Sequence, residues 1–217
     1  MDIGGLRDEY PGRGIDPADL MADPLAQLRS WLEDALAAGV AEPNAMTLAT
    51  SDRSGRPSAR MVLLKDLDDE GLMFFTNVGS RKGRELLAVP HAALTFWWPA
   101  MARQVVARGT AAPVGEEEAD AYFARRPRES QLSAWASPQS QVVASRAELE
   151  RRREDAARRY AGQPVPRPAQ WGGFRIRPVE MEFWQGRPGR LHDRVRYVRA
   201  GGDLAWPAEW QRERLAP

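Results

Sequence analysis

The stretch from Arg60 to Arg84 constrains the fold of this chain more than any other part of the sequence. It contains two apolar runs, residues 60–65 (RMVLLK) and 72–77 (LMFFTN), which are separated by an acidic segment that ends in glycine. Short apolar runs on either side of such a segment are typical of two strands joined by a turn. A helix-forming segment follows and stops at Pro90. The stretch therefore predicts a hairpin whose second strand leads into a short helix.

The corner between that second strand and the helix, Gly79-Ser80-Arg81-Lys82, suits a phosphate group. Free backbone N–H groups at a helix N-terminus and two adjacent cations both favour an anion. Of the 31 basic residues in the chain, only Lys65 and Lys82 are lysines, and both lie in this stretch. Either these two sites need a compact ammonium group rather than a planar guanidinium, or they are the few lysines that an arginine-rich composition leaves.

The remaining sequence predicts a mostly β protein with flanking helices. Asp23 followed by proline starts an amphipathic helix that ends at Gly39, as expected for an N-cap with proline at the first helical position. A helix is also predicted from Glu116 to about Arg126, and a capping box at Ser145 starts another. Several short strands separated by turns favour a barrel or a sandwich; they are residues 45–50, 92–97, 103–110, 173–177, 180–184 and 194–199.

Two parts of the chain differ in their expected order. Residues 1–22 are polar and interrupted by glycine and proline, so they are predicted to form a mobile N-terminal arm. Residues 23–217 show no internal repeat and no linker, so they are predicted to form a single domain.

The charge balance excludes several classes of protein. The 31 basic residues are offset by 30 acidic ones, which leaves a net charge of +1 and argues against a nucleic-acid or membrane surface. The chain has no cysteine, which excludes disulfides and thiolate chemistry, and no metal site is predicted. No apolar leader or 18-residue apolar run is present in the sequence. The expected location is the cytoplasm.

Five sequence blocks, in this order, resemble the pyridoxamine 5′-phosphate oxidase family. They are RMVLLK at 60–65, FFTN with GSRK at 74–82, RPRESQ at 126–131, AWASPQS at 134–140, and an ending made of FWQG, RLHDR and RLAP at 183–217. The resemblance extends from Arg7 to Pro217. It implies an FMN-binding split β-barrel and a homodimer with each FMN at the subunit interface. The implied reaction is oxidation of pyridoxine or pyridoxamine 5′-phosphate to pyridoxal 5′-phosphate, with O2 reduced to H2O2.

The resemblance also implies a set of FMN contacts. In this set Arg81 and Lys82 would bind the phosphate, Gln104 the ring edge, and Trp184 would form an apolar wall. Phe75 stands where close relatives carry tyrosine, which puts a side-chain hydroxyl contact in doubt but not a backbone contact. The full set is Arg60, Met61, Val62, Leu63, Lys65, Phe75, Thr76, Arg81, Lys82, Gln104, Gln139, Ser140, Trp184 and Arg194.

A second implied set binds the substrate. Tyr122 and Arg126 lie four residues apart on one predicted helix face, with Ser130 just beyond, so a convergent anion site is reasonable. Arg190 and His192, in the Arg-Leu-His motif, are the implied catalytic residues; Arg190 would orient the pyridine ring and polarise its C4′ substituent. His192 need not act as a base, because hydride transfer can carry the oxidation. The implied substrate set is Arg7, Tyr10, Lys65, Tyr122, Arg126, Ser130, Arg190 and His192.

Two other functions stay open from the sequence. A related split-barrel flavin oxidase could act on a different substrate, and it would be expected to alter the phosphate set or the Arg-Leu-His motif. A protein that binds FMN or pyridoxal phosphate without turnover is the other alternative. The intact motifs favour the oxidase over both.

Overall fold

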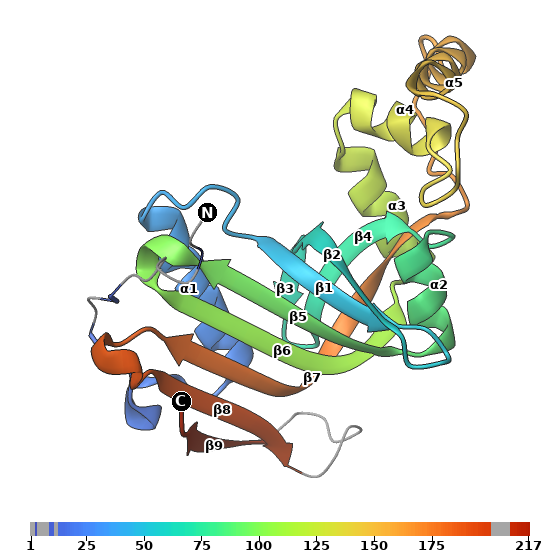
Figure 1. The fold of residues 1–217 in the computed structure, drawn as a ribbon. Coiled ribbons are helices and arrows are strands. Elements are labelled where there is room, and N and C mark those ends of the chain that lie inside the picture. The colour runs from blue at the N-terminus through green and yellow to red at the C-terminus, as the bar shows by residue number, and fades with distance from the viewer. Residues whose placement is uncertain (1–2, 4–8, 11–12, 201–208) are drawn as a thin grey trace.

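The computed structural model describes residues 3, 9–10, 13–200 and 209–217, and in this part of the chain nine strands form a single sheet (Figure 1). The strand order β2-β1-β5-β6-β7-β4-β3 forms the main path, and β8 and β9 branch from β7. The strands are β1 (Ala45–Ser51), β2 (Pro57–Leu63), β3 (Asp66–Asp68), β4 (Gly71–Asn77), β5 (His91–Trp98), β6 (Arg103–Pro113), β7 (Trp171–Gln185), β8 (Asp193–Ala200) and β9 (Glu209–Leu215).

Five α-helices and three short 3₁₀ segments accompany the sheet in the described residues. The mostly β expectation is therefore confirmed. The helices are α1 (Pro24–Ala37), α2 (Arg81–Ala88), α3 (Glu116–Arg125), α4 (Arg128–Ala136) and α5 (Arg146–Arg159), and the 3₁₀ segments are η1 (Pro17–Asp19), η2 (Pro99–Met101) and η3 (Pro188–Arg190).

Strand β7 divides the sheet into two branches. Its first half pairs with β4, from Trp171 opposite Asn77 to Ile176 opposite Leu72, while its second half pairs with β8 from Glu180 onward. Both partners lie along the same edge of β7, because β6 occupies the other edge from Phe174 to Gln185. The sheet therefore splits at the middle of β7, and the β3–β4 hairpin and the β8–β9 hairpin continue from there on different sides of the view in Figure 1.

The predicted break between strands 173–177 and 180–184 is wrong, because β7 runs through Pro178 without interruption. Proline cannot donate a ladder hydrogen bond, so a continuous strand needs an irregularity opposite it. The β6–β7 register shifts between Arg108 and Gly109, and Gly109 pairs with Pro178. A Cβ at Gly109 would lie 2.1 Å from the carbonyl oxygen of Arg177. Because glycine has no Cβ, β6 and β7 can approach each other closely at this bulge.

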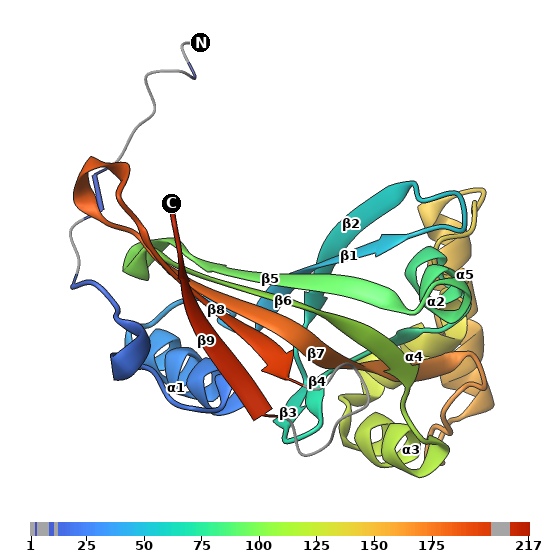
Figure 2. The ribbon, with the colours of Figure 1, turned by 90° about the horizontal axis from the view of Figure 1, so that it is seen from below.

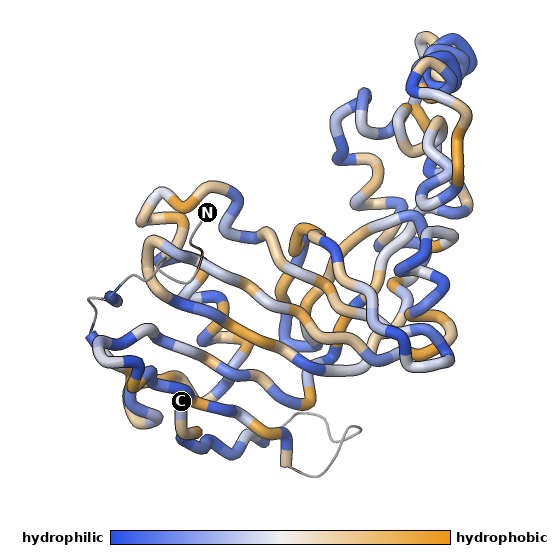
Figure 3. Tube along the Cα trace, in the orientation of Figure 1, coloured by the Kyte–Doolittle hydropathy of each residue, from blue (hydrophilic) through white to orange (hydrophobic). Residues whose placement is uncertain are grey.

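Helix α1 covers one face of the sheet, and no helix of the described residues covers the opposite face, which we call the open face (Figure 2). Trp31 on α1 is 3 % exposed and packs edge-on against Phe183 at 5.1 Å between ring centroids, which confirms its predicted core position. The side chains that alternate with this core point to the opposite face. There Met61 is 61 % and Trp97 is 44 % exposed. Figure 3 shows apolar residues alternating with polar ones along these strands.

Helices α3, α4 and α5 form a lobe that projects from the end of the sheet (Figure 1). Phe123, Leu132, Tyr160 and Trp171 are buried together beneath it. Ser145 caps α5 by accepting a hydrogen bond from the N–H of Glu148, as the capping box predicted. Helix α4 and strands β3 and β9 were not predicted from the sequence. The predicted hairpin of residues 60–65 with 72–77 is wrong, because β4 pairs with β3, which lies in the predicted turn, while β2 pairs with β1.

The N-terminal segment contacts the β8–β9 hairpin. Tyr197 Oη donates to the carbonyl of Met21 at 2.7 Å, and Arg212 Nη1 donates to the carbonyls of Pro17 and Leu20. These contacts connect the segment around η1 to the sheet. The mobile arm over residues 1–22 stays a prediction, and most of its first twelve residues lie outside the described part.

Candidate active site

A cleft of about 340 Å³ opens where β2 and β4 face helices α2 and α4. Both lysines of the chain line it, together with most of the predicted strand residues and part of the predicted phosphate set. The predicted residues in its lining are Met61, Val62, Leu63, Lys65, Phe75, Thr76, Lys82, Arg126, Ser130 and Gln139. The structure thus gathers residues from five separate segments around one space.

Lys82 presents an ammonium group to the cleft. Its Nζ donates to Thr76 Oγ1 and Gln139 Oε1, both at 3.1 Å, and to Ser80 Oγ at 3.4 Å. Burial, and then the nearby charge of Arg60, lower the pKa of Lys82 from its ordinary value. All three partners are neutral oxygens, so the positive charge is not cancelled by a carboxylate within hydrogen-bonding distance. Such a cation can bind an anionic ligand without first breaking an ion pair.

Arg126 is the second cation of the cleft. It follows the last residue of α3, and its guanidinium carbon lies 4.8 Å from the ring centroid of Trp171 and 5.4 Å from that of Phe123. Within the described residues its Nη1 is buried without a hydrogen-bond partner. Burial lowers the pKa of Arg126, and Tyr122 opposes that shift. A buried cationic donor without a partner is costly, which indicates a site for an anion.

Stacked aromatic rings support the wall of the cleft beside Arg126. Phe75 and Tyr122 are parallel within 4° with centroids 4.1 Å apart, and Phe75 and Trp171 are parallel within 3° at 5.3 Å. Tyr122 does not itself line the cleft, so its predicted contact with the substrate phosphate stays a prediction. The Phe75 ring is used for stacking, which needs no hydroxyl.

Some lining residues were not identified from the sequence. Ser133 on α4 and Ser137, the residue that caps the C-terminus of this helix, lie three and seven positions after Ser130, a spacing that places them along one side of the helix. That spacing would have revealed them once α4 was recognised. Trp171 lies far from the family motifs and carried no local signal. The lining residues missed are Asn77, Ser133, Ala134, Ser137 and Trp171.

Arg60 and Arg81 lie beside the cleft rather than in its lining and share one carboxylate. Glu85 Oε1 accepts from Arg81 Nε at 2.8 Å, and Glu85 Oε2 accepts from Arg60 Nη2 at 3.3 Å. Burial raises the pKa of Glu85, but hydrogen bonds from Ser58, Thr50 and Arg81 and the charge of Arg60 outweigh it and lower the pKa to about 2. Glu85 is therefore ionised at neutral pH.

A second group of predicted residues lies on the open face of the sheet. We call Tyr10, Trp184 and His192 the Trp184 cluster. Trp184 contacts Tyr10 edge-on at 5.7 Å and lies 4.7 Å from His192 between ring centroids. In the sheet register Trp184 stands between Gln104 on β6 and Arg194 on β8, so these two predicted residues flank the cluster.

Polar contacts orient the residues around the cluster. Arg194 donates to both carboxylate oxygens of Glu182, at 2.8 and 2.9 Å, and this pairing raises the pKa of Arg194. His192 Nδ1 accepts a hydrogen bond from the backbone N–H of Arg187 at 3.1 Å. Neutral His192 therefore carries its proton on Nε2. Both side chains have their orientation determined within the subunit.

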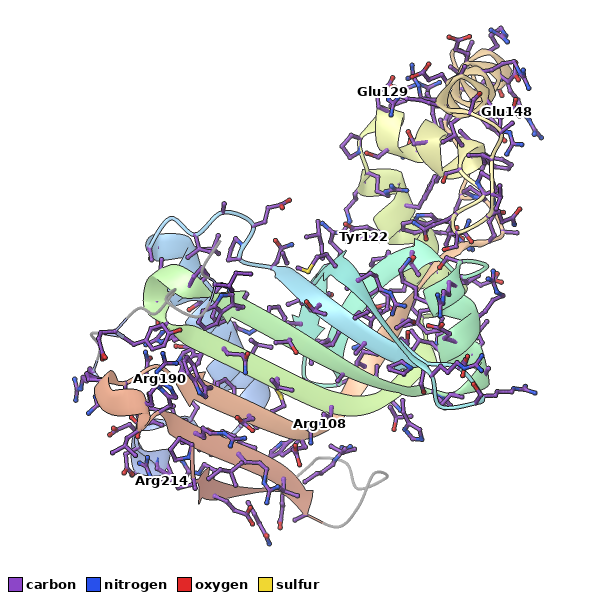
Figure 4. The ribbon with its side chains drawn as sticks, viewed as in Figure 1. Arg108, Tyr122, Glu129, Glu148, Arg190 and Arg214 are labelled. Atoms are coloured by element: carbon purple, nitrogen blue, oxygen red, sulfur yellow. The ribbon has the colours of Figure 1, made fainter. Side chains whose placement is uncertain are left out.

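Arg190 is exposed and adopts a positive φ of 65°. A non-glycine residue in this region carries strain of roughly 1–2 kcal/mol. Figure 4 shows Tyr122, which supports the cleft wall, where the helical lobe meets the sheet, and Arg190 on the side of the sheet away from the lobe. The cleft and the loop beside the Trp184 cluster are therefore apart within one chain.

Of the remaining predicted residues, Ser140 is exposed with a φ of 71° beside Gln139, and Arg7 lies outside the described residues. In the part of the chain that the structure describes, no three histidine, aspartate or glutamate side chains are grouped as metal ligands. Nor does any described helix combine the length and apolar character needed to cross a membrane.

Comparison with solved structures identifies the class of fold. A pyridoxamine 5′-phosphate oxidase-related, FMN-binding protein from Nostoc punctiforme superposes with a TM-score of 0.69 at 17% identity, covering 94% of this chain and 100% of the other. PhzG from Burkholderia lata, solved with tetrahydrophenazine-1-carboxylic acid, superposes with a TM-score of 0.86 at 35% identity, covering 94% and 98%. The sheet with its branched β7 is that of the split-barrel flavoproteins, which confirms the predicted fold.

Sequence comparison identifies the family. Residues 32–160 match the pyridoxamine 5′-phosphate oxidase family model, and residues 171–217 match the C-terminal dimerisation region of pyridoxine 5′-phosphate oxidase. The chain is 54% identical to the pyridoxine/pyridoxamine 5′-phosphate oxidase of Rubrobacter xylanophilus, over 100% of this chain and 97% of the relative, and 51% identical to that of Gloeothece citriformis, over 100% and 99%. The chain belongs to the pyridoxine/pyridoxamine 5′-phosphate oxidase family, a family of enzymes, and carries its dimerisation region.

Proposed function

We propose that this enzyme uses FMN and O2 to oxidise pyridoxine 5′-phosphate or pyridoxamine 5′-phosphate to pyridoxal 5′-phosphate. The observation that carries the proposal is that two half-buried cations of one cleft, Lys82 and Arg126, have no carboxylate partner among the described residues. Two phosphate monoesters, one on the cofactor and one on the substrate, account for two such cations in one space.

The residues around Lys82 fit the phosphate of FMN. Thr76 and Gln139 already contact the ammonium group, and Ser80 caps the helix α2 that begins there. A phosphate at this corner would face both the cation and the positive end of the helix dipole. When bound, FMN supplies the acceptor for the hydride that leaves C4′ of the substrate and passes the two electrons to O2.

The residues around Arg126 would hold the substrate phosphate. Ser130 and Lys65 line the same cleft and add a hydroxyl and an ammonium donor. The buried Nη1 of Arg126, which has no hydrogen-bond partner among the described residues, would gain one. Binding at a fixed phosphate would place the pyridine ring and its C4′ carbon at a defined distance, and most of the rate would come from that positioning.

The Trp184 cluster would complete the site from the partner subunit. Trp184, Arg190, His192 and Arg194 all lie within the segment that matches the dimerisation region; Trp184 and Arg194 are on β7 and β8, and Arg190 and His192 are in the loop between these strands. In a twofold dimer each cleft would face the other subunit's cluster. Arg190 would orient the ring, and His192 would donate from Nε2 to a polar ring substituent, because its Nδ1 is already an acceptor.

Two overall reactions follow from this arrangement. The alcohol substrate gives the aldehyde, and O2 becomes H2O2. The amine substrate gives an imine that takes up water and releases ammonia, with the same reduction of O2. Residues that hold the ring rather than the amine or hydroxyl group would serve both substrates.

A visible spectrum of the FMN-loaded enzyme, recorded without oxygen before and after pyridoxine 5′-phosphate is added, tests the proposal. The flavin band should bleach and then return with air. A protein that binds FMN but keeps its band unchanged would contradict the substrate, and one that binds no FMN after reconstitution would contradict the cofactor.

The likeness to PhzG at 35% identity supports a second candidate, the oxidation of a reduced phenazine carboxylate. Such a substrate has a carboxylate and no phosphate ester. The same anaerobic experiment with tetrahydrophenazine-1-carboxylic acid separates the two, because the first proposal expects no bleaching with this compound.

A further inference from the structure

We infer that Glu85 is a positioning residue: it orients Arg60 and Arg81 so that their free N–H groups face the phosphate of FMN. The inference rests on the proposed function and deepens it, since it explains how a cluster of cations stays ordered before the cofactor arrives.

Glu85 joins two cations that come from different elements. Arg81 begins α2 and lies four residues before Glu85 on the same helix, whereas Arg60 lies on β2. Each carboxylate oxygen takes one arginine, with Oε1 accepting from Arg81 Nε and Oε2 from Arg60 Nη2. The carboxylate therefore sets the position of a helix residue relative to a strand residue.

Two hydroxyl groups extend the same connection. Thr50 and Ser58 each donate to Glu85 Oε2 at 2.5 Å. Because their protons point to the carboxylate, their oxygens are available to accept from Arg60: Nη1 donates to Thr50 at 2.6 Å and Nη2 to Ser58 at 2.5 Å. The ionised Glu85 thus holds Arg60 directly and through two relayed hydrogen bonds, which strengthen one another.

The contacts leave part of each guanidinium unused. In the described part of the chain, Arg81 uses Nε and has no partner at either Nη, and Arg60 uses both Nη groups but not Nε. Arg81 is 60 % exposed despite its contact with Glu85. Its two Nη groups form the pair of donors that binds a phosphate in bidentate geometry.

The charges in this region match a phosphate dianion. Burial, and then the charge of Arg60, lower the pKa of Lys82, and Arg81 precedes Lys82 at the start of α2. Glu85 offsets one of the three positive charges, which reduces their repulsion and leaves a net charge of about +2, opposite to the −1.5 to −2 of a phosphate monoester at neutral pH.

The chemistry of Glu85 makes the inference testable by two substitutions. Glu85→Gln keeps the shape but replaces one acceptor oxygen by an NH2 donor, which must then face an arginine or a hydroxyl donor. Glu85→Asp keeps the charge but is one methylene shorter, so it cannot reach both arginines in the same geometry. If the role of Glu85 were purely electrostatic, only Glu85→Gln would lose it. If Glu85 positions the arginines, both Glu85→Gln and Glu85→Asp lose that role.

The experiment measures the dissociation constants of FMN and riboflavin for the full-length apoprotein by flavin fluorescence. Riboflavin lacks the phosphate, so the ratio of the two constants reports the phosphate contacts alone and cancels a general change in the folded protein. We expect each Glu85 variant to lower the preference for FMN by about tenfold. Glu118→Gln, which removes a carboxylate from Arg175 on another part of the sheet, is the matched control and should keep the wild-type preference.

The outcomes distinguish this inference from the proposed function. If the wild-type protein prefers FMN and both Glu85 variants keep that preference, the positioning role is refuted and the FMN site stands. If Glu85→Gln binds FMN more tightly, Glu85 acts only as an opposing charge, which also refutes the inference. If the wild-type protein itself does not prefer FMN to riboflavin, the phosphate site of the proposed function is refuted, and the role of Glu85 is refuted with it.

Discussion

The cleft and the Trp184 cluster place predicted site residues in opposite kinds of surroundings. The cleft combines strand residues with cations whose partners are hydroxyl, amide and aromatic groups. The Trp184 cluster consists of aromatic rings on an open sheet face, and the charged residue beside it, Arg194, is neutralised by Glu182. This difference indicates that the cleft is suited to binding anions, whereas the Trp184 cluster is suited to packing against a flat ring. Neither region alone contains both functions.

The largest expected effect is on the cleft. Arg126→Ala should lower kcat/KM for pyridoxine 5′-phosphate by about 100-fold or more, since a charge-assisted contact to the substrate phosphate is lost. Steady-state kinetics at saturating FMN would measure it. Arg146→Ala, which removes an exposed arginine of α5, is the control and should leave kcat/KM unchanged. An Arg126→Ala enzyme with wild-type kcat/KM would exclude the substrate phosphate from this position.

The next largest effect is the recovery of activity when two inactive variants are combined in one dimer, which tests whether the cleft and the Trp184 cluster meet across the subunit interface. Arg126→Ala alters the cleft and Arg190→Ala alters the loop beside the cluster, so each variant alone should be nearly inactive. The two chains would be co-expressed with different tags. Heterodimers purified by both tags have one intact site of two and should recover about half of wild-type activity, whereas the unsorted mixture should recover about a quarter. Arg126→Ala paired with a differently tagged Arg126→Ala chain should not recover, because neither chain then supplies an intact cleft. Recovery in that control, or none in the first pair, would place the two regions in separate functions.

Lys65→Ala should have a more modest effect within the cleft. The side chain is exposed at the rim and adds a flexible point charge, so its loss should raise KM by about tenfold and change kcat little. Measuring KM at several salt concentrations sharpens the result, because the difference from wild type should shrink as salt screens the ammonium group. An unchanged KM at low salt would remove Lys65 from the substrate set.

The smallest expected effect concerns stability in acid. Glu85 has a folded pKa of about 2, below its ordinary value of 4.5, so its ionised form stabilises the fold above about pH 4.5 and that contribution is lost as the pH falls toward 2. In urea unfolding, wild-type stability should therefore fall more steeply than that of Glu85→Gln below pH 4.5, by at most about 1.4 kcal/mol per pH unit. Parallel curves would mean that Glu85 titrates alike in the folded and unfolded chain.

Local signals predicted the parts of the fold that depend on neighbouring residues. Asp23 caps α1 through the N–H groups of Leu25 and Ala26, and Ser145 caps α5. Pro127 was expected to end a helix and does follow the end of α3, but α4 begins directly after it. The sequence pattern could not distinguish a stop from a corner, because proline is compatible with both.

By itself the sequence determined the mostly β class, the helix starts, the family motifs and the residues Lys65, Lys82, Arg126 and Ser130, which the structure brings into one cleft. Only the tertiary structure decided that β7 passes through Pro178, that Trp171 stacks on Phe75 in the wall of the cleft, and that Glu85 joins Arg60 to Arg81. Caps and motifs are read from residues a few positions apart. Glu85, by contrast, meets Thr50 and Ser58 from 35 and 27 positions away, and contacts of that separation arise from the packing of α2 against the sheet rather than from any local pattern.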